Sequence, residues 1–142
     1  MNRTSAPIVS DLVLLGGGHA NVQVLKKLAM KPIAGLRVTL ISDQTHAPYS
    51  GMLPGYLAGY YDYEDCHFDL RRLCEELGHR FIRARITGID AERKRIRLEN
   101  RPEIRYDCAS INVGIAPRPI ESSAGESDAK LIPLKPISRF IG

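Results

Sequence analysis

The chain has 142 residues, of which 44% are apolar and 25% charged, values typical of a soluble globular domain. This length suits one domain or part of a larger protein, and the formal net charge of +4 favours anionic partners. The sequence predicts neither a membrane span nor a secretory signal. Three cysteines, an odd number, argue against a disulfide framework, so we expect a cytoplasmic protein.

The first predicted elements form a βαβ unit. Residues 1–10 are expected to be a flexible N-terminal arm, and the apolar run at 11–15 then predicts a buried strand that ends at glycines. Apolar residues at helical spacing predict a helix over 20–30, and the β-branched stretch at 36–41 predicts a second strand. We expect the two strands to be parallel and joined by a right-handed crossover.

A long segment without clear periodicity follows at 42–66. It contains glycines, prolines and most of the tyrosines of the chain. Loops of this length in compact domains are usually functional or disordered, and the tyrosines argue against disorder. We therefore expect a functional loop.

The next segment predicts one helix and several strands. Asp69 is a good N-cap for a short helix, and Gly78 suits its C-terminal end. A strand is expected over 80–86, and the alternating stretches at 94–100 and 103–107 predict an antiparallel meander with one exposed face.

The mostly apolar stretch at 108–114 predicts a return to the buried parallel sheet. From 118 to 142, prolines and a Ser/Gly/Glu-rich stretch indicate a linker. The expected fold class is therefore α/β, a parallel sheet with an inserted antiparallel β-meander.

The turn between the first strand and the helix has the chemistry of a phosphate-binding loop. Gly16 allows a tight turn, and Gly18 lets the backbone approach a pyrophosphate at the helix N-terminus. Asn21 stands where a third glycine is usual. Its side chain should either push the helix outward or form hydrogen bonds itself.

A carboxylate at the end of the second strand would bind ribose hydroxyl groups. Ser42 occupies the usual place of that acid, and Asp43 follows it. Asp43 is the candidate ribose ligand, although an aspartate here also suits a loop-capping turn.

Four stretches together resemble a known family. They are "DLVLLGGGHANVQVLKKL", "VTLISD", "PYSGMLPGYLAG" and "RYDCASINVGIAP". They resemble the N-terminal part of the pyridine nucleotide-disulfide oxidoreductases. Within that family they are most similar to type II NADH dehydrogenase-like flavoproteins and to the flavoprotein domain fused to selenide, water dikinase.

The resemblance implies a Rossmann-like FAD-binding domain over about residues 11–117. It implies a flavoprotein oxidoreductase in which electrons pass from NAD(P)H through FAD to an acceptor that the sequence does not identify. The residues that it places near FAD are Gly16, Gly17, Gly18, His19, Ala20, Asn21, Ser42, Asp43, Tyr49, Ser50, Pro54 and Gly114.

The resemblance also implies that FAD and NAD(P)H bind to different domains. Family members continue into a second domain that binds NAD(P)H, so we expect this chain to be a fragment, with that domain or a second chain as a partner. The sequence does not decide whether the chain forms a homo-oligomer. Cys66 and Cys74 do not have the spacing of the family's redox-active pair, so dithiol chemistry is not expected. The alternative function is a nucleotide-binding regulatory or vestigial module without redox turnover.

The residues also suggest a metal site and a nucleic-acid-binding surface, and neither is expected. Cys66, His67, Cys74 and His79 offer metal ligands, but their spacing fits no structural zinc pattern, and no metal is expected. The arginines between 83 and 105 alternate with apolar residues, which is typical of a solvated sheet face. We therefore do not expect nucleic-acid binding.

Overall fold

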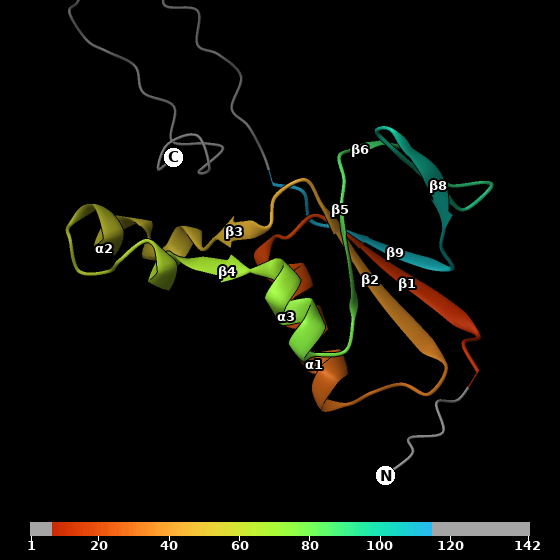
Figure 1. Ribbon diagram of the computed structural model, residues 1–142, viewed down its shortest axis with the longest axis horizontal. Helices are drawn as coiled ribbons and strands as arrows, with labels where there is room; N and C mark the ends of the chain where they lie inside the picture. The colour runs from red at the N-terminus through yellow and green to blue at the C-terminus, as the bar shows by residue number, and fades with distance from the viewer. Residues whose placement is uncertain (1–6, 115–142) are drawn as a thin grey trace, which may run out of the picture.

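The structure, a computed structural model, describes residues 7–114 and is built on a four-stranded parallel sheet (Figure 1). The strand order is β5-β2-β1-β9, so β5 and β9 are the edges. The strands are β1 (Ser10–Leu15), β2 (Leu36–Ser42), β5 (Arg80–Arg83) and β9 (Cys108–Ile111). The predicted βαβ unit is confirmed, because β1 and β2 pair in parallel from Ser10 with Leu36 to Leu15 with Ile41.

Two helices cover one face of this sheet (Figure 1). They are α1 (His19–Met30) and α3 (Leu70–Glu76). Leu14 and Leu40 point from the strands into this layer, where Val22, Leu25 and Leu70 are fully buried, along with Cys74. The layer also explains the helical spacing of the apolar residues in both segments.

A three-stranded antiparallel sheet covers the opposite face. Its strands are β6 (Ile86–Asp90), β7 (Arg95–Leu98) and β8 (Arg101–Arg105). Val13 and Leu15 point into this second core and pack with Ile96 and Leu98. Because successive side chains of a strand point to opposite faces, β1 supplies both cores.

The antiparallel meander is therefore confirmed, but the single strand expected at 80–86 is wrong. The expected strand at 80–86 divides into β5 of the parallel sheet and β6 of the meander. Ala84 lies between them and is buried, and the chain crosses from one sheet to the other at this point. A continuous β-rich stretch carries no signal for such a change of sheet.

The segment at 46–69 projects away from the rest of the fold, and we call it the extension (Figure 1). It was expected to be a loop, but it contains a short antiparallel pair, β3 (His46–Pro48) with β4 (His67–Asp69). Between these strands lie three short helical turns: η1 (Ser50–Met52), α2 (Leu53–Leu57) and η2 (Glu64–Cys66).

The predicted ends of the second helix are confirmed. The Arg72 amide donates a hydrogen bond to Asp69 Oδ1 at 3.0 Å, and Gly78 has a φ of +70° just beyond α3. The predicted N-terminal arm was too long, because Ser10 begins β1 and the Val9 amide donates to the Gly35 carbonyl at 2.9 Å.

The predicted linker at 118–142 lies outside the described residues. Within residues 7–114, no helix has the length and apolar character needed to cross a bilayer.

Candidate functional site

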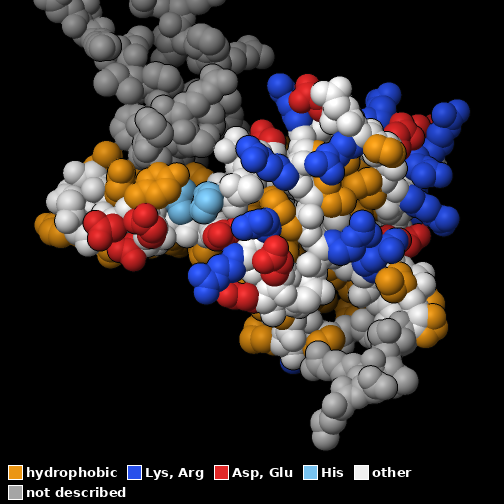
Figure 2. Space-filling model, viewed as in Figure 1, with side chains coloured by type: hydrophobic (Ala, Val, Ile, Leu, Met, Phe, Trp, Pro, Cys, Tyr) orange, Lys and Arg blue, Asp and Glu red, His pale blue; other side chains and the backbone are white. Residues whose placement is uncertain are grey.

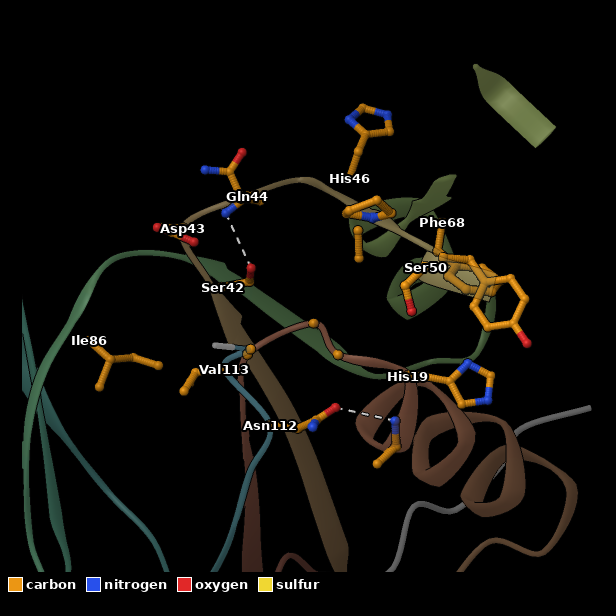
Figure 3. Close-up of a pocket in the computed structure, with 18 of the residues that line it drawn as sticks. His19, Ser42, Asp43, Gln44, His46, Ser50, Phe68, Ile86, Asn112 and Val113 are labelled. Atoms are coloured by element: carbon orange, nitrogen blue, oxygen red, sulfur yellow. Dashed lines mark hydrogen bonds between the residues drawn. The ribbon is translucent and has the colours of Figure 1, made fainter. Parts of the chain in front are cut away.

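A cleft of about 970 Å³ lies at the carboxyl ends of β1, β2 and β9, with the extension as its outer wall (Figure 3). This is the edge of a parallel sheet at which doubly wound folds bind their ligands. The volume is in the range of small-molecule and cofactor pockets, roughly 300–1,000 Å³. The lining comes from the segments 16–20, 42–50, 84–86 and 112–114, together with Phe68.

The glycine turn joins β1 to α1 at the base of the cleft. Gly16 has a φ of +87°, and a Cβ on it would collide with the backbone of Asn112 and Val113. The Gly16 amide donates to the Ile41 carbonyl at 2.8 Å, which ties the turn to β2. A side chain at this position would therefore be both conformationally strained and sterically blocked.

The other two glycines allow different segments to pack against the turn. A Cβ on Gly17 would meet the Leu70 side chain at the start of α3, and a Cβ on Gly18 would meet the Asn112 side chain. All three glycines are thus required by contacts between protein atoms. The same contacts fix the turn, so its cleft-facing backbone is held in place before any ligand arrives.

Asn112 holds the N-terminus of α1, a role that sequence reasoning missed. Its side-chain oxygen accepts a hydrogen bond from the Ala20 amide at 3.2 Å (Figure 3). Its carbonyl accepts one from the Gly18 amide at 3.2 Å. Asn112 follows β9 directly, so β9 positions the helix start. No local pattern identifies this role, because Asn112 and the Ala20 amide are 92 residues apart in the sequence.

Asn21 resolves the question raised by the missing third glycine. Its side chain is fully buried, and Nδ2 donates to the Leu15 carbonyl at 3.1 Å and the Gly16 carbonyl at 2.8 Å. Its Oδ1 accepts a hydrogen bond from Ser110 Oγ at 2.8 Å. Asn21 therefore forms hydrogen bonds rather than pushing the helix outward. It joins α1 to β1 and β9 and does not line the cleft.

Ser42 and Asp43 both line the cleft at the end of β2. Ser42 is buried, and its hydroxyl accepts a hydrogen bond from the Gln44 amide at 3.2 Å (Figure 3). Asp43 is exposed, and its backbone carbonyl accepts a hydrogen bond from Arg83 Nε at 3.3 Å. The serine therefore forms the local turn, which leaves the Asp43 carboxylate beside the cleft.

An aromatic wall closes the side of the cleft next to the extension. The His19 ring stacks on Tyr49 with ring centroids 5.1 Å apart. The centroids of the Tyr49 and Phe68 rings are 6.1 Å apart, in a tilted arrangement. Lys26 Nζ lies 5.4 Å from the centre of the Phe68 ring. These contacts join α1 to β4 and to Tyr49, the residue that follows β3, and Ser50 lines the cleft beside them.

The structure brings together all the predicted site residues except Asn21 and Pro54. Pro54 lies in α2, within the extension but away from the cleft. His46 also lines the cleft. The lining residues that sequence reasoning did not select are Gln44, Ala47, Pro48, Phe68, Ala84, Arg85, Ile86, Asn112 and Val113.

The candidate metal ligands lie in separate environments. His67 Nδ1 lies 2.6 Å from the Tyr63 carbonyl, and His79 Nε2 lies 3.3 Å from the Leu25 carbonyl. Cys74 is in the helix-side core, where burial raises the pKa of its thiol to about 11. In the part of the chain that the structure describes, no three His, Cys, Asp or Glu side chains form a potential metal site, and the three cysteines are free thiols.

The cleft fits a dinucleotide cofactor. Its base is a glycine turn that leads into a twelve-residue helix, so the helix dipole favours a pyrophosphate there. A carboxylate stands at the end of the neighbouring strand, where a ribose would lie. Phe68, Ala84 and Ile86 add apolar surface to the lining.

Comparison with curated proteins finds relatives of the same kind. The chain is 30% identical over 112 residues to a probable ferredoxin reductase from Castellaniella defragrans, a match that covers 77% of this chain and 27% of that protein. It is 24% identical over 121 residues to the sulfide-quinone reductase of Aquifex aeolicus, covering 85% of this chain and 27% of that protein. The chain thus spans about a quarter of the length of these relatives.

Solved structures share the fold. The ferredoxin reductase for the CYP199A2 system of Rhodopseudomonas palustris matches with a TM-score of 0.61 and 26% identity, over 78% of this chain and 28% of that one. Putidaredoxin reductase, in its covalent complex with putidaredoxin, matches with a TM-score of 0.67 and 22% identity, over 82% of this chain and 28% of that one.

The model of one protein family matches residues 10–132, which is most of the chain. The match includes the glycine turn, the extension, the meander and β9. It confirms the resemblance seen in the sequence and the expected cofactors of the family, FAD and NAD(P)H. The chain belongs to the pyridine nucleotide-disulphide oxidoreductase family, whose members are oxidoreductases.

Proposed function

We propose that this chain is the FAD-binding part of an NAD(P)H-dependent flavoprotein oxidoreductase. The observation that carries the proposal is the cleft at the carboxyl ends of β1, β2 and β9, with the glycine turn at its base. Gly16, Gly17 and Gly18 leave the backbone open to the cleft while protein atoms pack closely on their other sides. A pyrophosphate is the ligand that such a turn and helix N-terminus suit best.

The residues around the turn suit the remaining parts of the cofactor. The Asp43 carboxylate is placed to accept hydrogen bonds from the adenosine ribose at the end of β2. At the opposite end, Tyr49 and Ser50 would lie near the flavin, and the stack of His19 on Tyr49 would close the side of the site. When bound, FAD would accept a hydride and pass the electrons on to an acceptor.

The second half of the reaction requires partners. The chain spans about a quarter of its curated relatives, and we propose that NAD(P)H binds to a separate domain or chain. Within this chain, we propose that residues 11–117 form the FAD-binding part. The relatives include a probable ferredoxin reductase and a sulfide-quinone reductase, so the acceptor is not assigned.

The test is to measure FAD binding by the purified 142-residue chain. Absorbance of the chain as purified, followed by titration with FAD, gives occupancy and affinity. The variant Asp43→Ala should bind FAD about tenfold more weakly, because one charge-assisted hydrogen bond to the ribose is lost. The matched control Asp62→Ala removes an exposed acid of the extension that does not line the cleft, and it should leave the affinity unchanged.

Two outcomes would contradict the proposal. One is a folded, colourless chain that takes up no added FAD. The other is an equal loss of affinity in both aspartate variants, which would mean that general charge and not the ribose position matters. Bleaching of bound FAD by NADH, measured in the presence of the NAD(P)H-binding domain or chain proposed above, separates a working oxidoreductase from the alternative of a regulatory module.

A further inference from the structure

A second cavity, of about 420 Å³, lies beside the edge strand β5. It is lined by Thr45, His46, Asp69, Arg71, Phe81, Ile82, Arg83 and Arg101. It shares only His46 with the FAD cleft. Nothing in the proposed FAD chemistry uses this cavity, yet three arginines from distant parts of the chain reach it.

The fold brings these three arginines together. Arg71 is on α3, Arg83 ends β5, and Arg101 begins β8. Arg101 reaches this position because a tight turn at Asn100, with a φ of +53°, returns the meander from β7 to β8. Figure 2 shows Lys and Arg side chains gathered over β5 and the three-stranded sheet.

Among the residues that the structure describes, the positive charge of the cavity is only partly balanced. Within residues 7–114, none of the three guanidinium groups forms an ion pair. Asp69 is the one acid in the lining, and its carboxylate accepts the Arg72 amide at 3.0 Å as the cap of α3. Three guanidinium groups against one carboxylate leave an excess of two positive charges in this lining.

The other residues that line the cavity favour the binding of a small anion. Phe81 and Ile82 are half-buried and form an apolar wall, and charges interact more strongly beside such a wall than in bulk water. Arg83 is already oriented, since its Nε donates to the Asp43 carbonyl at 3.3 Å. Guanidinium groups match phosphate and carboxylate oxygens in pairs of parallel hydrogen bonds.

We propose that this cavity binds a small polyanion whose phosphate or carboxylate oxygens contact Arg71, Arg83 and Arg101. The volume of the cavity lies within the range of small-molecule pockets. The bound anion would offset the repulsion among the three arginines. The site is separate from the glycine turn, and it does not depend on FAD binding by the chain.

The test uses pyrophosphate and citrate as probes, each titrated into the 142-residue chain at constant ionic strength. Calorimetry measures affinity, and ¹⁵N NMR follows the Nε–H signals of the arginine side chains. We expect saturable binding of at least one probe with shifts at Arg71, Arg83 and Arg101. Which probe binds more tightly distinguishes a phosphate ligand from a carboxylate ligand.

Two variants locate the site. Arg101→Gln should weaken binding about tenfold, because it removes a charged donor from the cavity. The matched control Arg97→Gln removes an exposed arginine of the same sheet that lines neither cavity, and it should leave the affinity unchanged. Repeating the titration with excess FAD prevents pyrophosphate from occupying the glycine turn.

Four results would overturn the proposal. The first two are no saturable binding of either probe and an equal loss of affinity in the two arginine variants. The other two are NMR shifts confined to the amides of 16–21, and binding of an acidic peptide, titrated in the same way, without binding of either small anion. If the chain fails to bind FAD, the Nε signals still report on this cavity. The failure of one proposal is therefore distinguishable from the failure of the other.

Discussion

The glycine turn and the extension line the same cleft but are held in place by opposite means. The turn is fixed by backbone contacts and by a fully buried amide, that of Asn21. In the extension, Cys66 is the one buried residue, while Leu57 and Tyr60 are 59% and 81% exposed. Only Ala47 and Phe68 of the extension pack against the edge of the helix-side core, and the stack of His19 on Tyr49 adds a surface contact with α1.

This difference in packing indicates which part of the cleft is rigid and which part can change conformation. A site for a pyrophosphate needs fixed backbone groups, and the packed turn provides them. A segment with few buried contacts opens at low free-energy cost. We therefore expect substitutions in the turn to lower the unfolding free energy strongly and substitutions in the extension to be tolerated, and the predictions below test that contrast.

The largest effect is expected from adding a methyl group at Gly16. Gly16→Ala places a Cβ against the backbone of Asn112 and Val113 at a φ of +87°, and it should cost about 3 kcal/mol of unfolding free energy. The matched control is Gly59→Ala in the extension. Its φ is +77°, but a Cβ there meets nothing within 4 Å, so the cost should be about 1 kcal/mol.

Urea unfolding of the two glycine variants measures these free energies. Equal losses would mean that backbone conformation alone explains the cost. The claim that the turn is fixed by packing would then fail.

The next largest effect is expected at Asn21. Asn21→Ala leaves the Gly16 carbonyl and the Ser110 hydroxyl without their buried partner and should cost about 2 kcal/mol. Ser110→Ala removes only one of these hydrogen bonds and should cost about 1 kcal/mol. A double-mutant cycle in urea measures their coupling, and fully additive losses would show that the two side chains do not interact.

A smaller effect is expected at Asp69, where the extension meets α3. The hydrogen bond from the Arg72 amide lowers the pKa of this carboxylate. Asp69→Ala should cost about 1 kcal/mol at pH 7 through loss of the cap, whereas Asp69→Asn keeps a capping oxygen and should cost less.

The sign of the pH dependence follows from that lowered pKa. The stabilisation by the charged form is complete above the unfolded-state pKa of about 3.9 and is lost as the pH falls through the lower folded-state value. The difference between the wild-type protein and Asp69→Ala should therefore shrink in acid, as thermal unfolding at pH 7 and pH 3 would show. A difference that grows in acid would contradict the assignment.

The turn could be predicted from sequence because its signals are local. Gly16 and Gly18 follow an apolar strand and precede an amphipathic helix, and Asp69 and Gly78 mark the ends of another helix. Asn112 was missed as a cap because its partner, the Ala20 amide, is 92 residues away. No local pattern reports a contact of that kind.

The extension and the crossing between sheets could not be predicted for related reasons. The strands β3 and β4 have three residues each, too few for a periodic pattern, and they pair only with each other. Ala84 lies between two strands that belong to different sheets. Its position depends on which core each strand buries, and that depends on the whole fold.

The smallest effects are expected from the tyrosines of the extension. Tyr49→Ala removes the stack on His19 and should lower the unfolding free energy by about 0.5 kcal/mol, the lower end for an aromatic pair. Tyr60 is 81% exposed, and Tyr60→Ala should change it by less than about 0.5 kcal/mol.

Hydrogen exchange is the sharper measurement for these two variants, because it reports local opening. The Tyr49 amide donates to the Cys66 carbonyl at 2.8 Å across the base of the extension. Tyr49→Ala should speed exchange of amides in the extension while leaving those of β1 and β2 unchanged, and Tyr60→Ala should change neither. Faster exchange in β1 after either substitution would show that the extension and the turn unfold together, and the contrast between the two regions would then be lost.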